Sequence, residues 1–334
     1  MRLATRTARA AILGLGVHVP SRVLTNADLE KMVDTSDEWI ITRTGIRTRR
    51  VVDPDQAASD LAVPAALAAM ADAGLSADDV DLIICGTTTP DMVFPATACL
   101  IQDRIGAKRA GAFDLLAACS SFVYGLVSAA QTVEAGLARH VLVVGAEALT
   151  KLVDWTDRTI SVLIGDGAGA VVVGPSRSGA GISATAVGAD GSAADILKLP
   201  SPGSRIPATP EAIRKGLHRA RMDGQAVFKL AVRIVPDAIR QVTAAAGLRL
   251  EDLDWVVPHQ ANQRIIEAIA KGLELPLERF VSTIDRYGNT SSASIPLSLW
   301  EARRDGRLKD GDHVVLIAFG GGFTWSGCLV TWGS

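Results

Sequence analysis

Cys119 occupies a position in which a cysteine can act as a nucleophile. It follows the small apolar run at residues 115–118 and precedes apolar residues at helical spacing, so it is predicted to lie at a helix N-terminus. There the helix dipole and the free N–H groups favour a thiolate and lower the thiol pKa. A buried cysteine is also a common packing residue, and position alone leaves both interpretations open. Cys85, Cys99 and Cys328 lack this setting and are interpreted as packing residues.

Two polar side chains elsewhere in the chain have settings suited to catalysis. His259 follows an apolar strand at residues 255–257 and precedes a helix, and the carboxyl ends of parallel strands are where open α/β folds place ligands. Asn289 lies in a turn that enters another helix. Each also has a purely structural interpretation, a buried histidine for the first and a turn-completing asparagine for the second.

Glycines follow the last buried strand, at positions 320–322. Such residues let backbone N–H groups approach an oxygen closely, as an oxyanion hole requires, although tight packing explains them equally well. The other glycine cluster, at residues 165–169, lacks the spacing of a dinucleotide site. Neither a phosphate-binding P-loop nor a metal-binding spacing of cysteines and histidines is found.

The elements that must position these residues occur twice. The segment beginning at Gly74 is similar to the one beginning at Gly247, and the strand at residues 140–144 matches that at 313–317 with the same offset of 173 residues. In each half an amphipathic helix (61–73; 234–246), a buried strand (82–84; 255–257), a central helix (120–135; 292–304) and a second buried strand (140–145; 313–318) follow one another. This alternation predicts an α/β fold with mostly parallel sheets, and a duplication into halves 1–180 and 181–334. Residues 190–222, rich in Gly, Pro and Ser, interrupt the pattern as a loop over a site or a linker.

Composition narrows the function classes. With 34 basic and 36 acidic residues among 334, the net charge of −2 argues against a general nucleic-acid binder. No uninterrupted apolar run is long enough for a membrane span, and unpaired cysteine spacing favours the reducing cytoplasm. The Arg-rich start and the apolar stretch 11–17 could be mistaken for a secretory signal, but two glycines and Pro20 favour a first strand.

Motifs along nearly the whole chain resemble those of β-ketoacyl-[acyl-carrier-protein] synthase III. They are Thr35-Ser36-Asp37-Glu38-Trp39-Ile40 with Arg43-Thr44-Gly45-Ile46, Ala117-Ala118-Cys119, Gly165-Asp166-Gly167-Ala168-Gly169, Pro258-His259-Gln260-Ala261-Asn262, Gly288-Asn289-Thr290-Ser291 and Gly320-Gly321-Gly322-Phe323-Thr324-Trp325. The resemblance implies the thiolase-like five-layer αβαβα fold of two duplicated halves, which agrees with the repeat. It also implies a homodimer that starts fatty acid synthesis.

The resemblance assigns a role to each site residue. Cys119 would take the acyl group of an acyl-CoA, the backbone N–H groups of Cys119 and Gly321 would form the oxyanion hole, and His259 and Asn289 would stabilise the enolate made from malonyl-acyl carrier protein. No metal or redox cofactor is implied, since coenzyme A enters only as the substrate thioester, and acetyl-CoA is the expected primer.

The substrate contacts are implied in the same way. Trp39 and Arg158 resemble the pair that holds the adenine of CoA, Arg43 a phosphate partner, and Asn262 a pantetheine contact. Phe94 resembles the residue that closes the acyl pocket of the partner subunit. Lys229, Arg264 and Lys271 either form a docking face for the acidic carrier protein or are ordinary solvated charges.

The sequence departs from the family pattern at Ser120-Ser121, where the family more often has Ala-Gly. This leaves the nucleophile intact but brings the acyl pocket, and so the primer, into question. Three other functions remain: a secondary-metabolism acyltransferase that uses the same cysteine, another condensing enzyme such as a hydroxymethylglutaryl-CoA or ketide synthase, and a non-catalytic acyl-carrier scaffold. The combination of Cys119, His259 and Asn289 argues against the first and the last, and the motif contexts argue against the second.

Overall fold

The computed structural model describes residues 9–333, so the Arg-rich segment 1–8 lies outside the described residues. A five-stranded sheet forms one side of the molecule, with strand order β1-β7-β6-β4-β5. Its strands are β1 (Ala10–His18), β4 (Leu82–Gly86), β5 (Gly111–Leu115), β6 (Val141–Glu147) and β7 (Gly167–Pro175). β4 pairs in parallel with β5 and β6, whereas β1 and β7 are antiparallel to their neighbours. The expected first strand at residues 11–17 is confirmed as β1.

A four-stranded sheet faces the first one, with order β11-β12-β13-β8. It contains β8 (Gly181–Ala189), β11 (Trp255–Pro258), β12 (His313–Gly320) and β13 (Thr324–Thr331). β11 and β12 are parallel, and β13 and β8 run antiparallel. Both sheets are therefore mixed, and the pairs that the apolar patterns predict to be parallel are indeed parallel.

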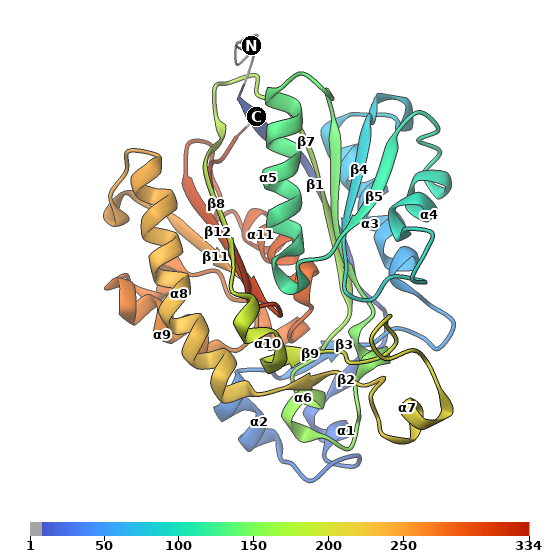
Figure 1. Ribbon diagram of the computed structural model, residues 1–334. Coiled ribbons are helices and arrows are strands. Elements are labelled where there is room, and N and C mark those ends of the chain that lie inside the picture. The colour runs from blue at the N-terminus through green and yellow to red at the C-terminus, as the bar shows by residue number, and fades with distance from the viewer. Residues whose placement is uncertain (1–8, 334) are drawn as a thin grey trace.

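Helices complete five layers (Figure 1). α3 (Ala58–Ala73) and α4 (Thr97–Arg104) cover the outside of the first sheet, while α8 (Gly224–Ala245) and α9 (Gln263–Leu273) cover the outside of the second. The central layer holds α5 (Ser121–Glu134) and α11 (Ser294–Arg304), which contact both sheets. Each helix layer buries its apolar stripe against a sheet, so three hydrophobic clusters fill the spaces between layers. This is the predicted αβαβα arrangement.

The duplicated elements occupy matching places. The 3₁₀ turn η2 (Ala118–Ser120) leads into α5 as η7 (Ser291–Ala293) leads into α11, 173 residues later. Both turns begin with a non-glycine residue at positive φ, +49° at Ala118 and +47° at Ser291. This conformation is uncommon outside glycine, so its occurrence at equivalent positions supports the duplication. The boundary near residue 180, between β7 and β8, stays a prediction.

Short elements gather at one end of the molecule, at the bottom of Figure 1. They are β2 (Val23–Thr25), α1 (Asn26–Leu29), α2 (Asp37–Thr44), β3 (Thr48–Arg50), α6 (Arg158–Ser161), β9 (Leu197–Lys198), α7 (Pro210–Arg214), β10 (Arg221–Met222) and α10 (Ile284–Tyr287). Within residues 190–222, expected to be a loop, the chain forms a short 3₁₀ helix, α7 and the two-stranded β9–β10 ribbon. Leu197 and Met222 of this ribbon line the cavity described below. Of the two expectations for this segment, a loop over a site or a linker, the structure agrees with the first.

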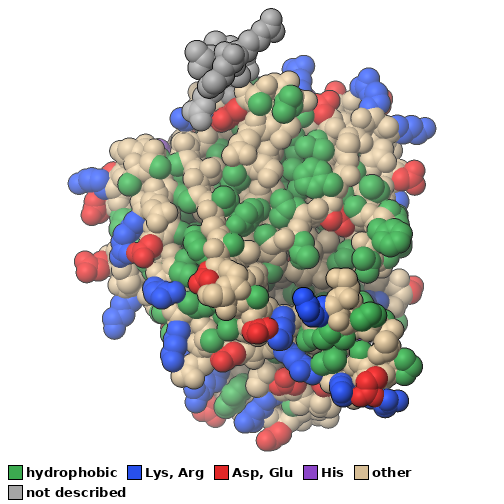
Figure 2. All heavy atoms as spheres, viewed as in Figure 1, with side chains coloured by type: hydrophobic (Ala, Val, Ile, Leu, Met, Phe, Trp, Pro, Cys, Tyr) green, Lys and Arg blue, Asp and Glu red, His purple; other side chains and the backbone are tan. Residues whose placement is uncertain are grey.

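The surface differs from side to side. In the view of Figure 2, hydrophobic side chains gather over α5, β5 and α4, whereas Lys and Arg side chains, with Asp and Glu between them, line the edge formed by α8 and α9. Between residues 9 and 333, no helix combines the length and the apolar character needed to cross a bilayer.

Candidate active site

One cavity of about 690 Å³ brings the predicted residues together. Its walls come from α2, α6, α8, α9, the η2 turn and the end of β12. The sequence-predicted residues that line it are Trp39, Arg43, Cys119, Arg158, Lys229, His259, Asn262, Arg264 and Asn289. Phe94, Gly321 and Lys271 are not among the lining residues. The catalytic candidates thus meet at one place, as the resemblance implies.

Cys119 is presented by the η2 turn at the N-terminal end of α5. The turn is fixed by its own backbone and by neighbouring hydroxyls. The Ala117 N–H donates to Ser121 Oγ at 2.8 Å, and Thr324 Oγ1 donates to the Ala117 carbonyl at 2.8 Å. With Ala118 at positive φ, the chain bends sharply just before the cysteine. The helix-N-terminal setting expected from the sequence is present.

The protonation of Cys119 differs from the expectation. Burial raises the pKa of the Cys119 thiol to about 12, and the negative field of Glu147 adds to that rise. A helix N-terminus stabilises the thiolate and so lowers the thiol pKa, but its contribution of roughly 1 kcal/mol is smaller than the cost of desolvating the thiolate here. The predicted resting thiolate is therefore wrong, and Cys119 is a thiol in the resting protein.

His259 is buried with one nitrogen held by the protein. Its Nδ1 lies 2.8 Å from Ser294 Oγ, and its ring meets the ring of Phe319 edge-on with centroids 5.4 Å apart. The other ring nitrogen, Nε2, has no hydrogen-bond partner among the described residues. Because His259 lines the cavity, Nε2 is available to a ligand there. Burial lowers the pKa of His259 to about 3, so the imidazole is neutral at physiological pH.

Asn289 is held so that its amide N–H₂ is available. Its Oδ1 accepts a hydrogen bond from the Ser291 N–H at 2.9 Å, and its backbone pairs with Leu163 and Gly165. The preceding Gly288 has φ +64°, and a Cβ there would lie 2.7 Å from the Leu163 carbonyl oxygen, so only glycine fits this turn. With its oxygen occupied, Asn289 can offer Nδ2 to a ligand in the cavity.

The glycine loop after β12 packs against residues 117–121 around Cys119, which we call the nucleophile turn. A Cβ on Gly320 would lie 2.5 Å from the backbone nitrogen of Cys119, so glycine is required for this approach. Gly320 lines the cavity, whereas Gly321, the predicted oxyanion-hole residue, lies beside the Leu197 carbonyl without lining it. The loop is close enough to Cys119 to share an oxyanion with it, and the assignment of Gly321 stays a prediction.

The cavity mouth carries the predicted CoA contacts. The Arg158 guanidinium lies over the Trp39 ring at 5.3 Å, and it also donates to the Asp34 carbonyl. A base stacked between the Trp39 ring and the Arg158 guanidinium would need these two groups to be about 7 Å apart. The exposed Arg158 side chain must therefore move outward before a base can enter between them. Asn262 caps α9 and donates to the Arg43 carbonyl at 3.1 Å, which joins α2 to α9 at this mouth.

Four further predicted residues lie outside the catalytic end of the cavity. Lys229 on α8 and Arg264 on α9 lie at its rim, and Lys271 lies two turns along α9, all of them exposed. Phe94 is 83% exposed, beside Val93 at 82%, and it lies away from the cavity of its own chain. The three exposed basic residues are thus accessible to a docking protein, and the exposed Phe94 is accessible to a partner subunit.

The serines that depart from the family pattern do not reach the cavity. Ser120 and Ser121 are both fully buried, and their hydroxyls meet Thr324 Oγ1 and the Ala117 N–H respectively. The expectation that they reshape the acyl pocket is therefore wrong for direct contact. They brace the nucleophile turn instead, because a serine hydroxyl can bond to nearby backbone groups.

Sequence reasoning missed Glu147, a fully buried carboxyl at the end of β6. It accepts hydrogen bonds from the N–H and hydroxyl of Thr88, from Thr89 Oγ1 at 2.8 Å and from Ser292 Oγ at 3.0 Å. Burial raises the pKa of Glu147, and these donors act against the rise. An acidic residue directly after an all-apolar strand was the available signal.

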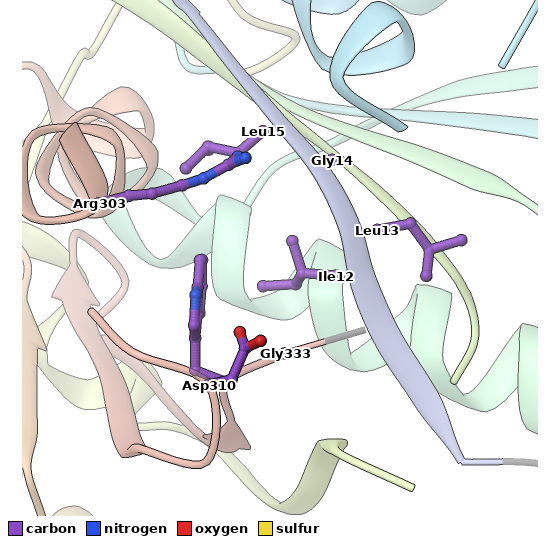
Figure 3. Close-up of a pocket in the computed structure, with 8 residues that line it drawn as sticks. Ile12, Leu13, Gly14, Leu15, Arg303, Asp310 and Gly333 are labelled. Atoms are coloured by element: carbon purple, nitrogen blue, oxygen red, sulfur yellow. The ribbon is translucent and has the colours of Figure 1, made fainter. Parts of the chain in front are cut away.

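A second, smaller cavity lies far from these residues, between β1 and the C-terminal segment (Figure 3). Arg303 of α11 and Asp310 point into it, but the Arg303 guanidinium is already paired with Asp72. The cavity holds about 130 Å³ and lacks a nucleophile or a histidine. Within residues 9–333, no group of three His, Cys, Asp or Glu side chains is placed to hold a metal ion.

Comparison with known proteins decides the family. Profiles described as 3-oxoacyl-[acyl-carrier-protein (ACP)] synthase III and its C-terminal part match residues 113–191 and 243–332. The β-ketoacyl-[acyl-carrier-protein] synthase III of Caldanaerobacter subterraneus subsp. tengcongensis is 52% identical over 97% of this chain and 98% of its own. The chain belongs to the β-ketoacyl-[acyl-carrier-protein] synthase III family. It is therefore an acyltransferase that initiates fatty acid biosynthesis.

Solved structures agree with this assignment. The crystal structure of 3-oxoacyl-[acyl-carrier-protein] synthase III from Aquifex aeolicus superposes with a TM-score of 0.91, at 45% identity over 97% of this chain and 100% of that one. A priming β-ketosynthase of the R1128 polyketide pathway superposes equally well but is 38% identical. The thiolase-like fold is thus confirmed, and the higher identities favour the synthase III family over the secondary-metabolism alternative.

Proposed function

We propose that Cys119, His259 and Asn289 carry out a two-step condensation of an acyl-CoA with malonyl-acyl carrier protein. In the first step the Cys119 sulfur attacks the thioester carbonyl of acyl-CoA. CoA leaves as a thiol that takes up the proton lost by Cys119, and the acyl group stays on the sulfur. Backbone N–H groups of Cys119 and Gly321 stabilise the tetrahedral oxyanion.

In the second step malonyl-acyl carrier protein loses its carboxylate as carbon dioxide. The electron pair of the broken bond moves to the thioester oxygen and gives an enolate, which accepts hydrogen bonds from His259 and Asn289. The carbanion attacks the acyl carbon, the Cys119 sulfur leaves and regains a proton from solvent, and a β-ketoacyl-carrier protein is released. This chemistry uses only side chains, backbone groups and the two thioesters, with no metal or redox cofactor.

The observation that carries this proposal is that an imidazole nitrogen and an amide N–H₂, both without a protein partner, belong to side chains that line the same cavity as Cys119. The neutral His259 has Nε2 free, and Asn289 has its oxygen bonded to the backbone so that Nδ2 is free. Two aligned donors stabilise a developing negative charge without taking a proton from it. An acyltransferase that does not decarboxylate has no need of both.

The substrate contacts follow from the cavity mouth. Trp39 and Arg158 hold the adenine, Arg43 pairs with the phosphates, and Asn262 contacts pantetheine on the way to Cys119. Arg guanidinium groups suit phosphate, and all four side chains line the same cavity. Acetyl-CoA is the proposed primer.

The protein partners are a second copy of the chain and the acyl carrier protein. β5 is the edge of its sheet, and Phe113 on it and Leu116 just after it are exposed. Met92, Val93 and Phe94, in the loop that leads into the β5-contacting helix α4, are exposed as well. An exposed edge strand with such a patch favours pairing with a second copy, in which Phe94 closes the partner's acyl pocket. Lys229, Arg264 and Lys271 provide a positive rim for an acidic carrier protein. Four free cysteines fit a cytoplasmic location.

The test measures two products from labelled acetyl-CoA and malonyl-acyl carrier protein. One carbon dioxide should be released for each β-ketoacyl-carrier protein formed, and Cys119→Ala should form neither the acyl-enzyme nor the product. Light scattering should give about twice the 35.0 kDa chain mass. Transfer of the acyl group to a hydroxyl or amine without carbon dioxide release contradicts the proposed function, and a fully active monomer contradicts the dimer.

A further inference from the structure

The buried Ser294 hydroxyl touches the one nitrogen of His259 that faces the protein. Ser294 is the first residue of α11 and is 1% exposed, and its Oγ lies 2.8 Å from His259 Nδ1. No other described side chain is within hydrogen-bond distance of that nitrogen. The direction of the hydrogen bond between Ser294 Oγ and His259 Nδ1 therefore decides which nitrogen of the neutral ring carries its single hydrogen.

The serine has one proton and two neighbours that can accept it. One is His259 Nδ1, and the other is the Ser291 carbonyl, also 2.8 Å from Ser294 Oγ. That carbonyl already accepts the backbone N–H of Ser294, so it does not depend on the hydroxyl. The hydroxyl is thus free to donate to Nδ1, an unprotonated ring nitrogen with no alternative donor among the described residues.

The two arrangements give opposite groups at the cavity. If Ser294 donates to Nδ1, the hydrogen of the ring is on Nε2, which becomes a donor facing the cavity. If Ser294 donates to Ser291, the ring hydrogen is on Nδ1, and Nε2 presents a lone pair. A lone pair would repel an enolate oxygen, so only the first arrangement serves the second reaction step.

We propose that Ser294 is a positioning residue that donates its hydroxyl proton to His259 Nδ1 and thereby keeps the Nε2–H directed at the substrate. The inference rests on the proposed donor role of His259. A hydrogen bond to one ring nitrogen of a histidine commonly fixes the tautomer in this way, and a wrong tautomer in a catalytic site is costly.

Helix α11 supplies a matched control one turn further on. Ser298 is also fully buried, and its hydroxyl lies 2.8 Å from Thr283 Oγ1 without contacting His259. Ser298→Ala therefore removes the same atom from the same helix, with a similar loss of buried hydrogen bonding. An effect of Ser294→Ala that Ser298→Ala does not share comes from the contacts of Ser294 with His259 and the Ser291 carbonyl, and the ring nitrogen signals below single out the contact with His259.

The experiment is nitrogen-15 NMR of the histidine rings, with the His259 signals assigned by their loss in His259→Asn. In the wild-type protein Nε2 should carry the hydrogen, and Nδ1 should have the shift of a hydrogen-bonded acceptor. Ser294→Ala should move the Nδ1 signal, whereas Ser298→Ala should leave it unchanged. Ser294→Thr, which keeps the hydroxyl, should restore it. These signals do not depend on the substrate, so they test the inference separately from the proposed function.

Rates complete the test. Carbon dioxide release by Ser294→Ala should fall at least ~10-fold, with a smaller change in acyl-enzyme formation, while Ser298→Ala changes neither by more than about 2-fold. A hydrogen on Nδ1 in the wild-type protein overturns the inference. So does an Nδ1 signal that is the same in Ser294→Ala, whatever the rates.

Discussion

The nucleophile turn, residues 117–121, and its counterpart 173 residues later, residues 290–294, have the same backbone and different chemistry. Each contains a non-glycine residue at positive φ, a single 3₁₀ turn and a buried serine that begins a central helix, Ser121 in one and Ser294 in the other. In the first turn the central position is Cys119, which faces the cavity. In the second it is Ser292, which is 1% exposed and bonds to the Gly86 carbonyl and to Glu147.

The difference shows how a duplicated fold divides its work. The first turn places a reactive atom in the cavity, and the Ser121 hydroxyl bonds to the backbone of the same turn. The second turn directs its central side chain into the protein, and its flanks provide Asn289 and the Ser294 contact to His259. One half thus contributes Cys119, the proposed carrier of the acyl group, and the other contributes His259 and Asn289, the proposed donors to the enolate.

The strongest test of the comparison replaces the two central residues. Cys119→Ala should lower condensation by about 10⁴-fold or more, because the covalent route is lost. Ser292→Ala should keep acylation and lower the free energy of unfolding by roughly 1–3 kcal/mol, because a buried donor to Glu147 is removed. Mass spectrometry after incubation with acyl-CoA should find the adduct on Cys119 in both the wild type and Ser292→Ala. An adduct on Cys85, Cys99 or Cys328 in Cys119→Ala would mean that the first turn does not supply the nucleophile.

The next test separates the two half-reactions. His259→Ala and Asn289→Ala should each slow carbon dioxide release by ~10²–10³-fold, or roughly 3–4 kcal/mol, while acyl-enzyme formation persists. The double variant should lose less than the product of the two, since both donors serve one oxygen. Both rates are measured on each variant. If His259→Ala abolishes acylation and spares decarboxylation, His259 acts as the base for the Cys119 thiol, a role that the raised pKa of that thiol makes worth testing.

The neutrality of His259 predicts a pH dependence of stability. Its pKa is about 3 in the folded protein against an ordinary value of 6.5, so the unfolded chain binds a proton first as the pH falls. The corresponding stability is fully present above pH 6.5 and is lost progressively toward pH 3, by about 1.4 kcal/mol per pH unit. Between pH 7 and pH 5 the wild type should therefore lose roughly 2 kcal/mol more than His259→Asn. Urea unfolding at the two pH values measures this, and equal losses would mean that His259 is charged in the folded state.

The sequence predicted the layers and the convergence of most candidate site residues on one cavity, because both depend on local patterns. Apolar strands and amphipathic helices repeated at one offset indicate a duplicated α/β fold, and the polar residues that follow such strands converge at a common edge. Local patterns also predicted the strand at residues 11–17 and the position of Cys119 at a helix N-terminus. Family motifs then added roles that spacing alone left open.

What failed depended on three-dimensional surroundings. The Cys119 pKa is set by desolvation in the assembled cavity, which local sequence does not reveal. The orientation of Ser120 depends on a contact with Thr324, about 200 residues later in the chain. The Ser294 contact is similar, because His259 and Ser294 come together only when β11 packs beside α11.

The smallest predicted effect concerns the two serines that brace the nucleophile turn. Ser121→Ala leaves the Ala117 N–H without its 2.8 Å acceptor in a buried place, which should lower the free energy of unfolding by roughly 1–2 kcal/mol. Ser120→Ala should lower it by less, because Thr324 Oγ1 has a shorter bond to the Ala117 carbonyl than its 3.2 Å contact with Ser120. Neither serine lines the cavity, so both variants should select acyl-CoA primers of the same chain length as the wild type. Urea unfolding and competition between acyl-CoA chain lengths check the two statements. A changed primer preference in Ser121→Ala with unchanged stability would show that the departure at Ser120-Ser121 acts on the acyl pocket after all.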